Sequence, residues 1–158
     1  MSSYRSWLAA SLALATLAGA AARAERYEAY AVKVYDGPLA RPDFSGSGRK
    51  HRLFRTVIRE GASGGVNFAG HYALVGIGCG AGCRLVVLVD VRSGRISSFP
   101  LSGEKYFELQ LKYRRDSRLV QAAWQDDLTC VTRELVFTGQ TFTTLRNQRQ
   151  DGDCPNRE

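Results

Sequence analysis

From Phe68 onward the sequence is a succession of short apolar segments separated by turn-forming residues. In FELQLKY, residues 107–113, apolar and polar side chains alternate with the period of a strand that buries one face. Two segments, 68–78 and 84–91, are apolar on both faces, as central strands are. Strands joined by hairpins are therefore predicted over residues 68–78, 84–91, 95–99, 107–113, 118–124, 130–137 and 141–146.

The part of the chain before Phe68 predicts one more strand and one helix. RYEAYAVKVYDG predicts a strand over Tyr27–Tyr35, which ends where Asp36-Gly37-Pro38 predicts a turn. Residues 50–60 place apolar side chains at helical spacing, with arginines on the rest of the wheel, and so predict an amphipathic helix. Its apolar positions are Leu53, Phe54, Val57 and Ile58.

The expected fold class is α+β, and mainly antiparallel β. We expect one twisted or partly closed sheet of about seven strands, packed by the single amphipathic helix. Residues 25–158 are long enough to form one β-rich domain with its own core. A C-terminal tail is expected from about residue 147.

Residues 1–24 have the pattern of a secretory signal peptide. Arg5 supplies a positive start, an apolar run follows, and small residues end at Ala24 as an A-x-A cleavage site. The apolar run is short and rich in alanine, which argues against a membrane span, and an uncleaved anchor is the alternative. We therefore expect a periplasmic or secreted chain that begins at Glu25 and has no membrane span.

The charge of the chain bears on its partners. The sequence has 22 Lys and Arg against 15 Asp and Glu, a net charge of +7, and loss of the two arginines of the leader leaves +5. The basic residues are scattered rather than gathered in a polyanion-binding tail. An exported chain of this charge meets an anionic envelope component or an acidic protein sooner than nucleic acid.

Four cysteines follow the leader, at Cys79, Cys83, Cys130 and Cys154. An even number of cysteines in an exported chain predicts disulfide bonds. Cys79 and Cys83 flank a three-residue loop between two predicted strands, so they can close the mouth of that hairpin. We favour the pairs Cys79 with Cys83 and Cys130 with Cys154.

A redox couple and a zinc site are the alternatives for these cysteines. A C-x-x-x-C spacing between strands differs from the C-x-x-C at a helix start that is typical of redox couples. The other soft ligands, His51 and His71 among them, have no finger-like spacing. No metal or cofactor is expected.

The segment GGVNFAGHY, residues 64–72, holds the candidate binding residues Asn67, His71 and Tyr72. Polar and ring-bearing side chains at a sharp turn before a buried strand can bind a ligand. The simpler alternative is structural, with Asn67 bonded to the backbone of the turn and His71 hydrogen-bonded within the core.

The segments NFAGHY, GCGAGC and DVRSG together resemble a family of uncharacterised exported bacterial proteins. That family has an N-F-A-G-[HK]-Y segment, followed by G-C-G-x-x-C and a D-x-x-[ST]-G turn, and the match covers about Arg55 to Ile96. The resemblance implies export and a β-rich fold, and it implies no reaction.

No motif of a common enzyme class is present, neither G-x-S-x-G nor H-E-x-x-H nor a P-loop, and no catalytic residue is assigned. The expected function is therefore a small non-catalytic binding or interaction module whose partner is an unidentified envelope component or protein. The alternative is a small hydrolase or thiol-redox protein that uses His71 or the Cys79/Cys83 pair. A cleft that joins Asn67, His71 and an acid would favour the alternative, and a buried His71 would favour the binding module.

Overall fold

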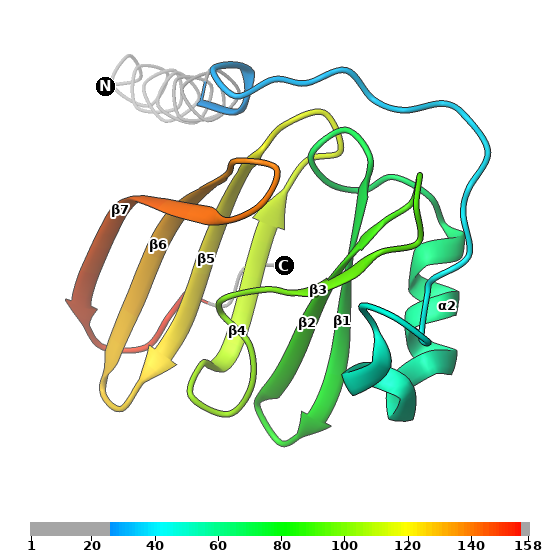
Figure 1. Cartoon of the computed structure of the whole chain (residues 1–158). Helices are drawn as coiled ribbons and strands as arrows, with labels where there is room; N and C mark the ends of the chain where they lie inside the picture. The colour runs from blue at the N-terminus through cyan, green and yellow to red at the C-terminus, as the bar shows by residue number, and fades with distance from the viewer. Residues whose placement is uncertain (1–25, 156–158) are drawn as a thin grey trace, which may run out of the picture.

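The computed structural model describes residues 26–155, so the predicted leader, residues 1–24, lies outside the described residues. Within them, seven strands form two antiparallel sheets (Figure 1). One sheet has three strands in the order β1-β2-β3, and the other has four in the order β4-β5-β6-β7. The strands are β1 (Tyr72–Gly80), β2 (Cys83–Asp90), β3 (Ile96–Ser98), β4 (Phe107–Tyr113), β5 (Leu119–Asp126), β6 (Thr129–Phe137) and β7 (Phe142–Asp151).

Two helical segments lie directly before β1, between residues 49 and 63. The 3-10 helix η1 (Arg49–Phe54) runs directly into the α-helix α2 (Arg55–Ser63). The sequence predicts one helix over 50–60, whereas the structure joins two kinds of helix and ends three residues later. Gly64 still has a helical backbone, and Gly65, with a φ of +79°, then leaves the helical conformation, which glycine does readily.

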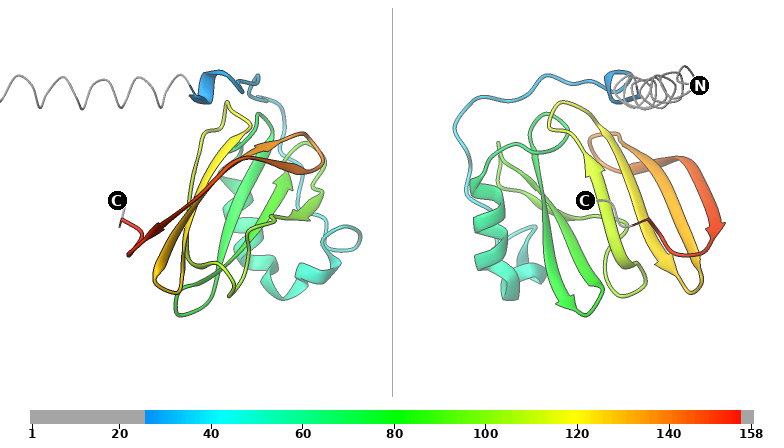
Figure 2. Two further views of the ribbon diagram at one scale, coloured as in Figure 1. Left: turned by 90° about the vertical axis from the view of Figure 1, so that its left-hand side faces the viewer. Right: turned by 180° about the vertical axis from the view of Figure 1, so that it is seen from behind.

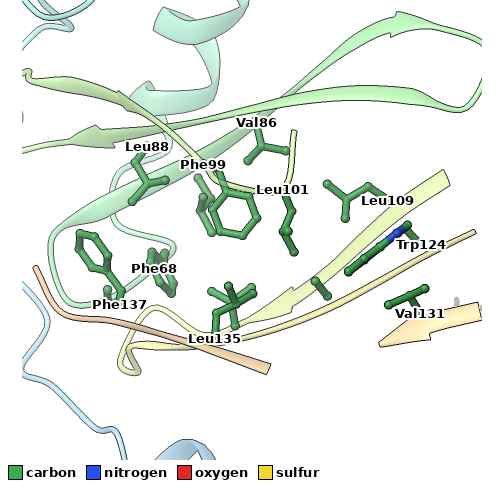
Figure 3. Close-up of a cluster of buried hydrophobic side chains, with 14 residues drawn as sticks. Phe68, Val86, Leu88, Phe99, Leu101, Leu109, Trp124, Val131, Leu135 and Phe137 are labelled. Carbon is green, nitrogen blue, oxygen red and sulfur yellow. The ribbon is translucent and has the colours of Figure 1, made fainter. Parts of the chain in front are cut away.

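Apolar side chains of both sheets meet in a core between them (Figure 3). The three-stranded sheet contributes Leu74, Val86 and Leu88, which point toward the four-stranded sheet. The four-stranded sheet contributes Leu109, Val120, Ala122, Trp124, Val131, Leu135 and Phe137. Burial of this surface at about 25 cal/mol per Å² of apolar area holds the two sheets together.

The opposite face of β1 and β2 is also apolar. Ala73, Val75 and Ile77 alternate with the residues that face the other sheet, and they form a second buried cluster with Ile58 and Ala62 of α2. Figure 1 shows α2 beside β1, on the side away from the four-stranded sheet. Two buried faces explain why β1 and β2 are apolar at successive positions.

The predicted apolar face of the helix is only partly correct. Ile58 is fully buried, but Leu53 and Val57 are 93% and 41% exposed. The 3-10 turn of η1 changes the angle between successive side chains from 100° to about 120°, so the apolar positions of the two helical segments do not share one face.

The prediction of a single sheet is wrong. β3 pairs with β2 over three residues only, and beyond it the link continues as single backbone bonds, from the amide of Phe99 to the carbonyl of Val86 and from Glu108 to Gly82. The chain between β3 and β4 therefore breaks the ladder, and the four-stranded sheet turns to cover the apolar face that β1 and β2 leave open.

The predicted strand over Tyr27–Tyr35 is also wrong. Its only strand-like pairing within the described residues is the isolated bridge of Ala31 with Ser117. Tyr27 instead packs with Leu119 and Val136 against the end of β5 and β6. The chain then runs across one end of the sheets and down beside α2 (Figure 1, Figure 2).

Phe107 does not face the core as the alternation in β4 predicts. Glu108 has a φ of +54°, and the register with β5 shifts between Phe107 and Gln110. This bulge turns Phe107 outward, where its side chain is 44% exposed.

β7 is the edge of the four-stranded sheet. It continues to Asp151, through residues 147–151 that were expected to be tail, and its side chains after Phe142 are exposed. Among residues 26–155, no helix has the length and apolar character needed to cross a membrane.

Candidate functional site

The side chain of Asn67 forms hydrogen bonds with the backbone of β1. Its Oδ1 accepts a hydrogen bond from the amide of Leu74 at 2.7 Å, and its Nδ2 donates to the carbonyl of Leu74 at 3.0 Å. The side chain lies between the turn and the strand because the chain reverses over Phe68–Tyr72, where the two end residues exchange backbone bonds. Asn67 therefore holds the start of β1 in place.

The turn that follows Asn67 joins three parts of the fold. The amides of Ala69 and Gly70 donate to the carbonyls of Ser117 and Arg115, between β4 and β5. The carbonyl of Gly70 accepts from the amide of Tyr35 in the N-terminal segment. The backbone of this segment is thus largely occupied by contacts within the molecule.

His71 is partly buried and contacts a cation. Its Nε2 lies 2.6 Å from Nη2 of Arg92, which is a donor, so Nε2 is the acceptor and His71 is neutral in this contact. Burial, and then the charge of Arg92, lower the pKa of His71 below its usual value, while Asp90 opposes the shift. A neutral His71 is consistent with a role in orienting Arg92.

Tyr72 links the two sheets. Its ring stacks beside that of His71 at 4.2 Å and meets the ring of Phe137 edge-on at 4.8 Å. Its hydroxyl donates to the carbonyl of Gly139, in the turn between β6 and β7, at 3.4 Å. Burial, and then the charge of Asp90, raise the pKa of the Tyr72 hydroxyl, so Tyr72 stays protonated.

Asp90 is the acid nearest to this cluster, and it stabilises its own turn. Oδ1 accepts from the amide of Arg92 at 3.0 Å, and Oδ2 accepts from the hydroxyl of Ser93 at 3.0 Å. The guanidinium of Arg92 lies 3.6 Å from Asp90 as a salt bridge. The structure thus brings His71, Tyr72, Asp90 and Arg92 together, while Asn67 faces the backbone of Leu74.

The cysteine pairs are those that the sequence analysis favours. Cys79 bonds Cys83 with Cα atoms 5.1 Å apart, and Cys130 bonds Cys154 with Cα atoms 4.7 Å apart. Among residues 26–155, none of the cysteines is free, and no group of three His, Cys, Asp or Glu side chains is placed to hold a metal ion.

The loop closed by Cys79 and Cys83 packs on β4. Gly82 has a φ of +67°, and a Cβ at this position would clash with the ring of Phe107. The carbonyl of Gly82 also accepts from the amide of Glu108 at 2.7 Å. The outward turn of Phe107 is therefore matched to the absence of a side chain on Gly82.

Four arginines recur at steps of three, three and four residues along the two helical segments. They are Arg49, Arg52, Arg55 and Arg59, called the arginine stripe below. Steps of three residues in the 3-10 helix and of four in the α-helix return a side chain to the same side. Contacts agree, because Arg52 donates to the carbonyl of Phe44 at 2.8 Å and the guanidinium of Arg59 lies 5.4 Å from the Phe44 ring centre.

The arginine stripe has no acidic partner. All four residues are exposed, and none forms a salt bridge with a carboxylate among the residues that the structure describes. Between residues 41 and 60 the sequence has six basic residues against two acidic ones. The 3-3-4 spacing is the sequence signal that predicts this stripe once the helix types are known.

A groove lies beside the end of the stripe, between α2 and the extended segment that precedes it. Its volume is about 470 Å³. The lining residues are Leu39, Ala40, Arg41, Pro42, Arg59, Ala62 and Ser63. The sequence analysis missed this groove because its two walls are brought together by contacts with the β2–β3 turn, which no local pattern encodes.

Comparisons with known proteins identify no relative. Searches of protein-family models, of curated proteins and of solved structures each found no match.

Proposed function

We propose that the protein is an exported, non-catalytic binding module that docks on an anionic lipid surface of the cell envelope. The observation that carries the proposal is the arginine stripe, an array of exposed guanidinium groups without acidic partners. Two disulfides are compatible with the oxidising compartment that export requires.

The dimensions of the stripe suit an extended anionic surface. From Arg49 to Arg59 the chain follows two helical segments, which rise about 2.0 Å per residue in the 3-10 part and about 1.5 Å in the α-helix. Guanidinium groups pair with phosphate oxygens through two hydrogen bonds at a time. Several phosphate headgroups can therefore be engaged along one side of the helices.

Exposed apolar side chains on the same two helical segments favour a lipid surface over a soluble polyanion. Leu53 is 93% exposed and Val57 is 41% exposed. Apolar side chains on a different side of a helix from its cations are typical of helices that lie in a membrane interface, with the apolar groups among the acyl chains and the cations at the headgroups.

The motif residues of the proposed exported family support a binding module rather than an enzyme. Asn67 bonds the backbone of Leu74, Cys79 and Cys83 close a hairpin, and Asp90 holds its turn. His71 contacts Arg92. These roles maintain the fold and the position of cations, and none of them supplies a nucleophile with an adjacent base.

Vesicle flotation tests the proposal. The oxidised protein is expected to float with vesicles of phosphatidylcholine mixed with phosphatidylglycerol, and to remain unbound with phosphatidylcholine alone. Arg49→Gln with Arg55→Gln, two residues of the stripe, should weaken binding roughly 30-fold, at about 1 kcal/mol for each basic side chain near the surface. Leu53→Ser should weaken binding to the mixed vesicles without changing the net charge.

The matched control is Lys33→Gln with Arg115→Gln, which removes the same charge from exposed positions outside the helices. Equal loss of binding in the control and in the helix variant would show that net charge alone attracts the protein. Binding to both kinds of vesicle, or to neither, would contradict the proposal.

A further inference from the structure

The groove beside α2 is a preformed feature of the fold. The amide of Ala40 donates to the carbonyl of Val91 at 2.7 Å, and the amide of Asp43 donates to the carbonyl of Gly94 at 2.8 Å. These bonds attach one wall, the segment 39–42, to the turn after β2. The other wall is α2, whose Ala62 is buried against the sheet.

Close approach at Gly94 keeps this wall in place. A Cβ on Gly94 would clash with the carbonyl oxygen of Arg41, so the wall lies directly on the turn. Tyr35 supports the start of the segment, because its hydroxyl donates to the carbonyl of Pro38 at 3.1 Å. Both walls are therefore fixed before any ligand arrives, which lowers the entropic cost of binding.

The lining of the groove is amphipathic. Leu39, Pro42 and Ala62 supply apolar surface, and Leu39 remains 47% exposed. Arg41 and Arg59 supply two guanidinium groups that form no salt bridge with a carboxylate among residues 26–155. An apolar surface with two unneutralised cations is complementary to a molecule with an alkyl chain and an anionic head.

The polar groups of the groove are suited to an anion. Ser63 donates its hydroxyl hydrogen to the carbonyl of Glu60 at 2.7 Å, so the two guanidinium groups are the side-chain donors of the lining that remain to meet a ligand. The contact of Arg59 with the ring of Phe44 fixes the direction of one of them. Guanidinium groups bind the planar oxygens of a carboxylate, or those of a phosphate, with two hydrogen bonds each.

We infer that this groove binds a single amphipathic anion, an alkyl chain with one carboxylate or phosphate head, with the head between Arg41 and Arg59 and the chain on Leu39, Pro42 and Ala62. The volume of about 470 Å³ lies within the range of small-molecule sites, about 300–1,000 Å³. This site goes beyond the docking of the arginine stripe on a membrane, because it takes one soluble molecule and includes Arg41, which is outside the stripe.

Titration of the protein by nuclear magnetic resonance tests the inference. The probes are decanoate and decyl phosphate, with decyl maltoside as the neutral molecule of the same chain length and acetate and inorganic phosphate as heads without a chain. Both anionic amphiphiles, below their micelle concentrations, should shift the amide signals of Ala40, Ala62 and Ser63. The neutral amphiphile and the heads alone should bind at least tenfold more weakly.

Variants of the two arginines test where the anionic head of the ligand binds. Arg41→Gln should weaken binding of both anionic amphiphiles about tenfold, the value of one charge-assisted hydrogen bond of about 1.5 kcal/mol. The control Arg115→Gln removes an exposed arginine between β4 and β5 and should leave the affinity for both amphiphiles unchanged. Thermal unfolding of each variant checks that it is folded, and Arg59→Gln is the second variant of the groove.

Three results would overturn the inference: equal affinity for the neutral amphiphile, binding of inorganic phosphate as tight as that of decyl phosphate, or unchanged affinity in both Arg41→Gln and Arg59→Gln. The vesicle experiment separates this inference from membrane docking. Arg41→Gln should still float with anionic vesicles, whereas Arg49→Gln with Arg55→Gln should still bind the anionic amphiphiles in the groove.

Discussion

The side chain of Asn67 hydrogen-bonds both backbone groups of Leu74, since it accepts from the amide and donates to the carbonyl. A neighbouring strand would form the same kind of pair. β1 is the edge of its sheet, so this backbone amide and carbonyl have no strand on their outer side. The pair of bonds depends on an amide side chain, since a carboxylate offers no donor.

Asn67→Asp should therefore lower the free energy of unfolding by about 1–3 kcal/mol, the cost of an unpaired carbonyl in a partly buried site. Urea unfolding measures the change. Asn147→Asp is the matched control, because Asn147 lies on exposed β7 and uses only its Oδ1, which accepts from Arg133. A loss of the same size in both variants would show that the added charge, and not the lost donor, is responsible.

Protonation of His71 should lower the free energy of unfolding as the pH falls below 6.5, the ordinary pKa of a histidine side chain. The pKa of folded His71 is lowered by burial and by Arg92, so the unfolded chain binds a proton first as the pH decreases. The contribution of neutral His71 to the free energy of unfolding is complete above pH 6.5. It is lost as the pH falls from 6.5 to the pKa of His71 in the folded protein.

Urea unfolding between pH 7.5 and about 5 measures this slope. His71→Gln keeps an acceptor for Arg92 without a titrating ring, and it should flatten the dependence. Burial, and then the charge of Lys50, also lower the pKa of His51, so His51→Gln measures the part of the pH dependence that His51 contributes. An unchanged slope in His71→Gln would contradict the conclusion that His71 is neutral and accepts a hydrogen bond from Arg92.

The two disulfides should differ in their contribution to stability. Replacing Cys130 and Cys154 together by serine opens a loop with a separation of 24 residues, which the chain-entropy relation values at about 3 kcal/mol. Replacing Cys79 and Cys83 together opens a separation of 4 residues, worth about 2 kcal/mol on the same relation. Chemical unfolding under oxidising conditions compares the two, and the reverse order would contradict the entropic account.

Gly82→Ala should destabilise the protein by more than the roughly 1 kcal/mol that a left-handed backbone conformation costs. The added methyl group would also clash with the ring of Phe107. Gly78→Ala is the control, because a Cβ at Gly78 meets no atom within 4 Å. In the background of Phe107→Ala the clash is absent, so the cost of Gly82→Ala should fall there, and a double-mutant cycle measures the coupling. Purely additive costs would rule out the contact.

The strands after residue 68 were predictable because each is marked by its own alternation and its own turn residues. The positions of β2, β4, β5 and β6 differ from the predicted segments by two residues or fewer at each end. The pairing of Cys79 with Cys83 was predictable for the same reason, since it depends on a hairpin that local sequence encodes.

What the sequence did not predict depends on contacts between distant segments. Tyr27–Tyr35 has the composition of a strand, yet Tyr27 and Tyr30 pack on β5 and β6, and its backbone pairs at single residues. The division into two sheets follows from the short β3, and the groove follows from bonds between Ala40 and Val91. At the candidate site, the partners of Asn67 and His71 lie 7 and 21 residues away along the chain.

The bond between Cys130 and Cys154 has a consequence for how copies of this chain can associate. It joins the second residue of β6 to a residue just beyond the end of β7, so the hairpin of the two strands becomes a covalent ring. An edge strand is an element that two copies can exchange in domain swapping. In the oxidised protein β7 cannot leave as a linear segment with a free end, so its exchange between copies requires reduction first.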